Sequence, residues 1–353
     1  MSEGAMSEGA MSDRAMSEGA MSERATAGRL IDGFDGVLAD LDGVVYTGHQ
    51  AIEGATSALE RLGTEGKSLA YVTNNASRSS DQVAAHLREL GAPAVAEQVF
   101  GSALAGAELL ARQVAPGASV LVVGSETLAD AVRAQGLVVV ASAADEPDAV
   151  IQGFAPTLGW KDLAEASYAV TAGAVWVATN TDMSIPQERG IAPGNGTLVA
   201  AVTAAAGQSP SVAGKPGAAL FETAARHSGV ERALVIGDRL DTDILGGNRA
   251  GMATALVLTG VDTVRAALSA RADERPDYLI GSLVELFEEY PEVRIEDGRY
   301  SCGQAVAEVN EFAVTVTGRE DDVDSWRAAC AAWYAADPDG TADVPEVCFV
   351  TAG

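Results

Sequence analysis

The sequence of 353 residues contains few cysteines, no long apolar segment and little positive charge. Its three cysteines all lie in the last 52 residues, at Cys302, Cys330 and Cys348, without the paired spacing typical of zinc or redox motifs. We therefore expect reduced, structural cysteines and a cytoplasmic protein. No apolar run approaches the roughly 18 residues of a membrane-spanning helix, and no basic segment followed by an apolar one opens the chain. These absences argue against a transmembrane helix and a secretory signal.

Basic residues are outnumbered by acidic ones, 23 to 50, which gives a formal net charge of −27. Nucleic acids and anionic membrane surfaces would be repelled over most of such a surface, so we expect neither as a partner. An anionic substrate would need a local attraction, such as a bound cation, a lysine or the amino end of a helix.

The first 25 residues are five near-copies of a pentad that begins with Met-Ser. A period of five makes no continuous stripe on a helix, and the pentads offer almost nothing to bury, so we predict a disordered tail over residues 1–29. Five of the seven methionines lie here, and an alternative interpretation is an upstream extension of a gene that truly starts at Met21. We expect no functional residue in this segment.

From Leu30 onward, short apolar runs alternate with Ala-rich amphipathic stretches. This alternation predicts the α/β class, with a doubly wound, Rossmann-like parallel sheet. Helices are expected between Ser79 and Gly91, between 196 and 207, and after Pro216. The predicted strands are 36–40, 68–73, 119–123, 138–141, 149–153, 175–179, 234–237 and 254–258.

The last 60 or so residues have a different pattern, which predicts a small α+β module. Residues 312–317 alternate as a half-buried strand, 321–336 read as a helix with an acidic first turn, and 347–350 form a final strand. The module contains no motif that suggests chemistry. Covering an apolar face of the core and mediating a homodimer are two candidate roles.

The strongest local motif is Val37-Leu38-Ala39-Asp40-Leu41-Asp42-Gly43. A buried strand that ends in two carboxylates places both at the carboxyl edge of a parallel sheet, where α/β proteins bind ligands. Two alternatives are a solvated strand end and a calcium loop, in which Asp-x-Asp-Gly also occurs.

Three further segments follow predicted strands. In the first, the hydroxyl and amides of Thr73-Asn74-Asn75 can hold phosphate oxygens, with simple turn chemistry as the alternative. The second places Lys215, one of three lysines, before a helix, although lysine is often only a surface residue. The third brings Asp238, Asp241 and Asp243 together, and this density of negative charge favours a bound cation.

In this order, the four segments resemble the haloacid-dehalogenase (HAD) superfamily of phosphohydrolases, from about Phe34 to Val261. The segments 178–182 and 194–197 resemble its class IIA, the 4-nitrophenylphosphatase or NagD-like branch, which includes phosphoglycolate, glycerol-3-phosphate and pyridoxal-phosphate phosphatases. The resemblance implies a catalytic core at 30–103 and 209–288, an inserted α/β cap at 104–208, and an appended module at 289–353.

The resemblance also implies a mechanism that these residue types permit. Asp40 would be the nucleophile that forms an aspartyl-phosphate, and Asp42 the general acid and base. A Mg²⁺ ion would bind the carboxylates of Asp40 and Asp238 and the main-chain carbonyl of Asp42. Asp243 would hold waters or orient the lysine. Phosphate would be bound by Thr73, Asn74 and Lys215.

In this family the cap carries substrate choice through a loop, here 179–189. Asn180 and Asp182 on the loop and Asn75 on the core are candidate substrate-binding residues, and ordinary turn-building is the alternative for each. The loop lacks the His-Pro pair of pyridoxal-phosphate enzymes, which favours glycerol 3-phosphate or 2-phosphoglycolate as substrate.

The sequence thus predicts a magnesium-dependent phosphomonoesterase of a small phosphorylated metabolite. One alternative keeps the same site and transfers the phosphoryl group to a second sugar. The other is a binding or regulatory protein with a relic core. We expect the histidines, His49, His86 and His227, to be solvated or packed and to have no catalytic role.

Overall fold

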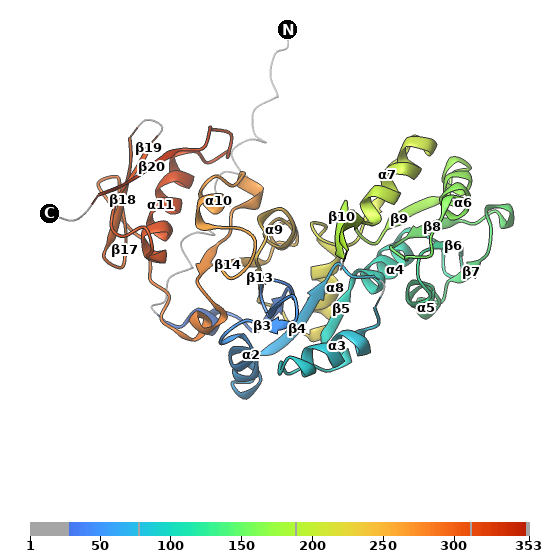
Figure 1. The fold of residues 1–353 in the computed structure, drawn as a ribbon, viewed down its shortest axis with the longest axis horizontal. Helices are drawn as coiled ribbons and strands as arrows, with labels where there is room; N and C mark the ends of the chain where they lie inside the picture. Colours follow the sequence, from blue (N-terminus) through green and yellow to red (C-terminus); the bar gives the residue numbers. More distant parts are fainter. Residues whose placement is uncertain (1–27, 77, 188, 311–312, 351–353) are drawn as a thin grey trace, which may run out of the picture.

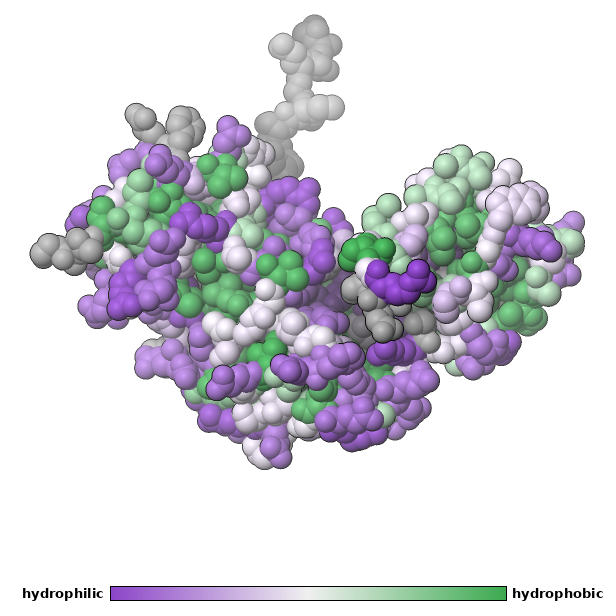
Figure 2. Space-filling model, viewed as in Figure 1, coloured by the Kyte–Doolittle hydropathy of each residue, from purple (hydrophilic) through white to green (hydrophobic). Residues whose placement is uncertain are grey.

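A computed structural model describes residues 28–76, 78–187, 189–310 and 313–350. The repeated pentads lie outside these residues. Three sheets follow one another across the molecule, each with its own helices (Figure 1). The first sheet is central, the second lies at one end (green), and the third lies at the other (orange to red). Hydrophilic residues cover most of the face seen in Figure 2, and hydrophobic ones occur as separate groups.

The first sheet is parallel and confirms the predicted α/β class. Its strand order reverses between β1 and β13, because the chain builds β4 and β5 on one side of β1 and β13, β14 and β15 on the other. Every residue of β1 is buried, as expected for a central strand covered on both faces. The strands are, in order across the sheet, β15 (Tyr278–Ile280), β14 (Ala253–Val257), β13 (Ala233–Gly237), β1 (Gly36–Ala39), β4 (Ser68–Thr73) and β5 (Val99–Gly101).

Helices flank this sheet. The α3 helix begins after Ser79, whose hydroxyl accepts a hydrogen bond from the Gln82 amide while the Gln82 side chain accepts one from the Ser79 amide. A short hairpin of β2 (Tyr46–Thr47) and β3 (Gln50–Ala51) follows β1. The helices are α2 (Ala55–Thr64), α3 (Ser80–Glu89), α8 (Ala219–Ser228), α9 (Leu245–Arg249) and α10 (Val264–Leu268), with one π-helical turn at Leu240–Ile244.

The second sheet is also parallel. It contains β12 (Ser211–Val212), β9 (Val175–Ala178), β8 (Ala149–Gln152), β6 (Ser119–Val123) and β7 (Val138–Val140), in that order. Since β12 pairs with β9, this sheet extends to Val212, four residues beyond the 208 boundary expected from the sequence. Its helices are α4 (Ser102–Gln113), α5 (Glu126–Ala134), α6 (Trp160–Thr171) and α7 (Asn195–Ala206), and the hairpin β10 (Ser184–Gln187) and β11 (Gly190–Pro193) leads into α7.

The third sheet is larger than the sequence suggested. The helix α11 (Val323–Ala336) and the two expected strands β19 (Ala313–Thr317) and β20 (Glu346–Val350) are present, and Phe312 lies outside the described residues. Three antiparallel strands precede them: β16 (Arg294–Glu296), β17 (Arg299–Cys302) and β18 (Ala305–Asn310). The three cysteines are free, as expected.

Two apolar clusters join the three parts. One continues from core strands, at Leu38 and Val72, through Leu110 of α4 to Val120 and Ile151 of the second sheet. The other brings Leu256 and Leu279 of the core together with Val316, Trp326 and Trp333 of the C-terminal module. The module therefore covers an apolar face of the core, one of the two roles considered for it.

No helix in the described ranges is long and apolar enough to cross a membrane.

Candidate active site

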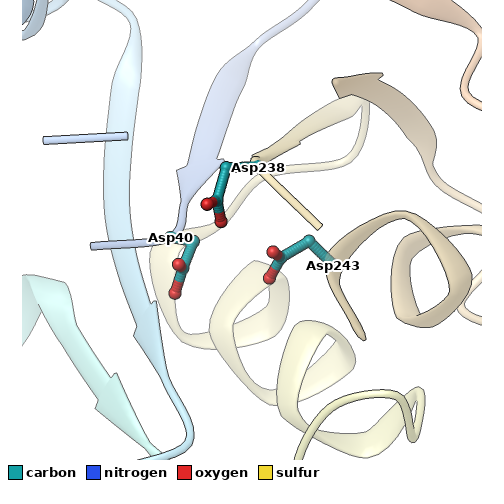
Figure 3. Close-up of side chains that lie close together, drawn as sticks. All are labelled: Asp40, Asp238 and Asp243. Carbon is teal, nitrogen blue, oxygen red and sulfur yellow. The ribbon is translucent and has the colours of Figure 1, made fainter. Parts of the chain in front are cut away.

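Three carboxylates meet at the carboxyl edge of the first sheet, where its strand order reverses (Figure 3). Asp40 follows β1 and Asp238 follows its neighbour β13, while Asp243 belongs to the π-helical turn. One oxygen from each lies within 4.8 Å of the others. Asp238 and Asp243 are buried and Asp40 is half-buried. The reversal point of an open α/β sheet is a usual ligand-binding position.

Lys215 bridges two of these carboxylates. Its Nζ donates to Asp40 Oδ1 at 2.5 Å and to Asp243 Oδ1 at 2.7 Å, and the side chain is only 5% exposed. Burial alone would lower the pKa of this lysine, but the charges and hydrogen bonds of Asp243 and Asp40 raise it above its usual range. Lys215 therefore stays cationic inside the site, and Asp243 accepts a hydrogen bond from it.

Asp238 is fitted tightly against Gly43. This glycine has φ +74°, and a Cβ on it would collide with the Asp238 carboxylate. Asp238 Oδ2 accepts a hydrogen bond of 2.8 Å from the Val261 amide. The glycine of the Asp-x-Asp-Gly motif thus leaves room for an acid from another strand.

Burial raises the pKa of all three carboxyl groups. It raises the pKa of Asp238 to about 6 although the Val261 amide opposes it, and that of Asp243 to about 6 although Lys215 opposes it. The pKa of Asp40 is raised by burial against the opposing charge of Lys215. One lysine does not neutralise three carboxylates, and hard oxygen ligands suit Mg²⁺. The donor set therefore fits the divalent cation that the sequence predicts.

Asp42 lies beside this cluster and lines a cleft of about 540 Å³. Burial raises the pKa of its carboxyl group, opposed by the charges of Lys215, His86 and Arg78. A raised pKa favours the protonated form that a general acid needs. Thr73, Asn74, Asn75, Lys215 and Asp182 also line the cleft, so most residues predicted for the site come together around one space.

The Asn74 side chain is hydrogen-bonded to other residues of the protein. Its Nδ2 donates to Asp182 Oδ1 at 3.0 Å and to the Lys215 carbonyl at 3.2 Å, and its Oδ1 accepts from the Lys215 amide at 2.8 Å. Asn74 thus ties the loop that carries Asp182 to the turn after β12 that carries Lys215. Burial raises the pKa of Asp182, and the hydrogen bond from Asn74 opposes the rise.

Asn180 does not line the cleft, contrary to the role considered for it. It is 4% exposed, its Nδ2 donates to the Asn74 carbonyl at 2.8 Å, and its Oδ1 accepts from the Asp182 amide at 3.2 Å. Its main-chain carbonyl accepts a hydrogen bond from Asn195. Asn180 shapes the loop that presents Asp182, which is the turn-building alternative.

The cleft also contains side chains to which the sequence assigned no role. Arg239 directly follows Asp238, and its guanidinium binds both carboxylate oxygens of Asp241, at 3.0 and 2.8 Å. The position of Arg239 beside the acidic motif was the available signal for it. The hairpin side of the cleft is formed by Met183, Ser184 and Ile185.

Comparisons with known proteins agree with this geometry. Two family models match, haloacid dehalogenase-like hydrolase over residues 37–138 and HAD-hydrolase-like over 212–286. The chain is 51% identical over 245 residues to the D-glycerol 3-phosphate phosphatase of Mycobacterium tuberculosis, covering 69% of each chain. It is 38% identical over 254 residues to a 5′-nucleotidase of Bacillus subtilis, covering 71% of this chain and 97% of the relative.

Solved structures extend the likeness to the third sheet. The crystal structure of a glycerol phosphate phosphatase from M. tuberculosis in complex with calcium has a TM-score of 0.83 and 43% identity, covering 91% of this chain and 94% of its own. The same enzyme in complex with magnesium gives a TM-score of 0.80 at 43% identity, over 92% and 95%.

Proposed function

The chain belongs to the haloacid dehalogenase-like hydrolase family and is a phosphatase of small phosphorylated metabolites, and we propose that its substrate is glycerol 3-phosphate. The observation that carries this proposal is the group of three carboxylates beside Lys215, two of them buried and one half-buried, next to a cleft that Asp42 lines. The relative at 51% identity is a D-glycerol 3-phosphate phosphatase.

The charges of the cleft favour glycerol 3-phosphate over 2-phosphoglycolate. Among the described residues that line it, the cations are Lys215 and Arg239, and each is already paired with carboxylates. Asp182 adds a further negative charge beside the phosphate-binding segment. A second anionic group held within this cleft would therefore face acids without a free cation, whereas hydroxyl groups can donate to those acids.

In the proposed reaction, a carboxylate oxygen of Asp40 attacks the substrate phosphorus, and the bond from phosphorus to the alcohol oxygen breaks. Asp42 gives its proton to the departing alkoxide. It then takes a proton from the water that hydrolyses the aspartyl-phosphate, which frees phosphate and restores Asp40. The raised pKa of Asp42 supports the first of these steps.

The remaining residues would bind the metal ion or the phosphate and keep the reacting groups in position. Asp40 and Asp238, with the Asp42 carbonyl, would hold Mg²⁺, which supplies positive charge to offset the phosphoryl oxygens. Lys215 supplies a second positive charge next to Asp40. Because the Asn74 amide is engaged by Asp182, we assign phosphate contact to the Thr73 hydroxyl and to the main chain of Asn74.

Release of phosphate from a panel of phosphomonoesters tests the proposal, with magnesium or with excess chelator. Wild-type enzyme should turn over glycerol 3-phosphate faster than 2-phosphoglycolate, only with metal, and Asp40→Asn should abolish turnover. Asp35→Asn is the matched control, because Asp35 pairs with Arg232 at the opposite end of β1. Phosphate release without an added acceptor would exclude a phosphotransferase, and absence of turnover for every ester would refute the proposal.

Two further predictions accompany this function. A cytoplasmic location is supported by three free cysteines, one of them exposed. A homodimer stays a candidate assembly, which light scattering of the purified protein tests.

A further inference from the structure

A second cavity shares Asp42 with the active-site cleft. It has a volume of about 660 Å³ and lies between the β2–β3 hairpin and the α3 helix. We call it the hairpin groove. Asp42, Tyr46 and His49 line one side, and Arg78, Gln82, His86 and Glu89 line the other. Ligand sites commonly have volumes of roughly 300–1,000 Å³, so the groove is large enough for a small molecule.

The walls of the groove are fixed by local structure. Gln82, His86 and Glu89 are spaced by four and three residues, which places them on one face of α3. The His86 ring packs edge-on against Tyr46 with centroids 5.4 Å apart. Gln82 accepts the Ser79 amide with its Oε1 in the helix cap, so its amide N–H groups remain available as donors.

Arg78 is the charged group that distinguishes this groove from the cleft. Within the described ranges its guanidinium has no ion pair and no side-chain hydrogen bond, whereas Arg239 in the cleft is held by Asp241. Arg78 and His86 line the same cavity as Asp42. An unpaired guanidinium thus lies near the residue that must face the leaving group.

We propose that the hairpin groove binds the alcohol part of the substrate, with Arg78 and His49 donating hydrogen bonds to its free hydroxyl groups. The inference rests on the proposed function, because Asp42 has to reach the departing oxygen and the alcohol must extend from that point. The lining offers donors from Arg78, Gln82 and the histidines together with an acceptor, Glu89. This mixture matches a polyhydroxy alcohol, which both donates and accepts. A carboxylate could pair with Arg78 but would only accept and would also face Asp42 and Glu89.

The test compares two esters that differ only in those hydroxyls. Glycerol 3-phosphate and n-propyl phosphate share the phosphate and the three-carbon chain, and the ratio of their kcat/KM values reports recognition of the hydroxyls. Arg78→Ala should lower this ratio about tenfold, the usual size for losing a hydrogen bond to a charged group, and His49→Ala should lower it less. Arg112→Ala is the control, since Arg112 is exposed on α4 and lines neither cavity.

Three outcomes would overturn the inference. An unchanged ratio in Arg78→Ala would show that the groove does not contact the alcohol. An equal loss of kcat/KM for both esters would make Arg78 a positioning residue for Asp42 or for phosphate. A larger loss with 2-phosphoglycolate than with glycerol 3-phosphate would make the groove a carboxylate site. Failure of the wild type on every ester would refute the proposed function itself, so the two failures are distinguishable.

Discussion

Replacing Asp238 by asparagine should stabilise the metal-free protein and at the same time abolish its response to magnesium. Asp238 is 3% exposed and shares its space with two other carboxylates, which the single positive charge of Lys215 does not neutralise. An asparagine keeps the shape, and its Oδ1 can still accept the Val261 amide. The substitution therefore removes a buried charge and little else.

The size of the effect follows from the pKa of Asp238, which burial raises from 3.8 to about 6. A shift of about two units at roughly 1.4 kcal/mol per unit gives an upper value of about 3 kcal/mol, and we expect about 1–3 kcal/mol. Because the folded pKa is the higher one, the folded state holds the proton more tightly. The wild type accordingly loses stability as pH rises from about 4 to about 6 and loses no more above that. The variant should lack this part of the pH dependence.

Thermal unfolding in chelator at pH 7.5 tests this, with an expected rise in Tm of roughly 2–6 °C for Asp238→Asn. In magnesium the advantage of the variant should disappear or reverse, because a ligand at a hundred times its Kd adds about 2.7 kcal/mol to the wild type and little to the variant. Asp241→Asn is the control, since Asp241 belongs to the same segment but is exposed and paired with Arg239. A lower Tm for Asp238→Asn in chelator, or equal magnesium shifts in both proteins, would refute the reasoning.

Further perturbations follow from the same geometry. Asp42→Asn should lower kcat for glycerol 3-phosphate at least about a hundredfold and lower it less for p-nitrophenyl phosphate, whose leaving group needs less protonation; equal losses would argue against a general acid. Asp182→Ala removes the tether to Asn74 and should raise KM several-fold in steady-state assays, whereas an unchanged KM would contradict this. Apparent magnesium affinity, measured by calorimetry, should weaken as pH falls below about 6, where Asp238 and Asp243 are protonated, and a flat profile down to pH 5 would contradict it. Deleting the C-terminal module should lower the free energy of unfolding by several kcal/mol, since it uncovers Leu279 and its neighbours; an unchanged Tm would oppose this.

Eight parallel strands were predictable, and all of them except β7 consist mostly of buried residues, whereas the short parallel strands β5, β12 and β15 were not predicted. Such strands appear as continuous apolar runs that end at glycine or a polar residue, and each of the eight expected strands is present within one residue at either end. The acids that follow β1 and β13 could be placed at one edge for the same reason. Adjacent parallel strands end at the same edge, and the likeness to a known phosphatase family added the roles.

The features that the sequence could not predict depend on residues that become neighbours only in the folded structure. The two residues of β12 form a strand only because β9 lies beside them, and the exposed Arg294–Glu296 strand carries no apolar pattern. The sequence around Asn180 is the same whether its amide faces a ligand or, as observed, a main-chain carbonyl, so the sequence could not distinguish the two roles. The hairpin groove exists because α3 lies against β2–β3 in the folded chain. The residues near His49 or His86 in the sequence therefore did not predict it.

The apolar cluster that crosses α4 determines how the second unit can move. Gly106 brings this helix close to the second sheet, since a Cβ there would lie 3.3 Å from Ile151 and Thr179. We call the contact that this cluster makes between the core and the second sheet the seam. A hinge motion that pulled the seam apart would cost about 2.5 kcal/mol for every 100 Å² of apolar surface uncovered. Small sliding displacements along the seam keep that surface covered. Substrate exchange in this enzyme should therefore proceed by shear of the second unit and displacement of its β10–β11 hairpin, with the seam itself staying closed.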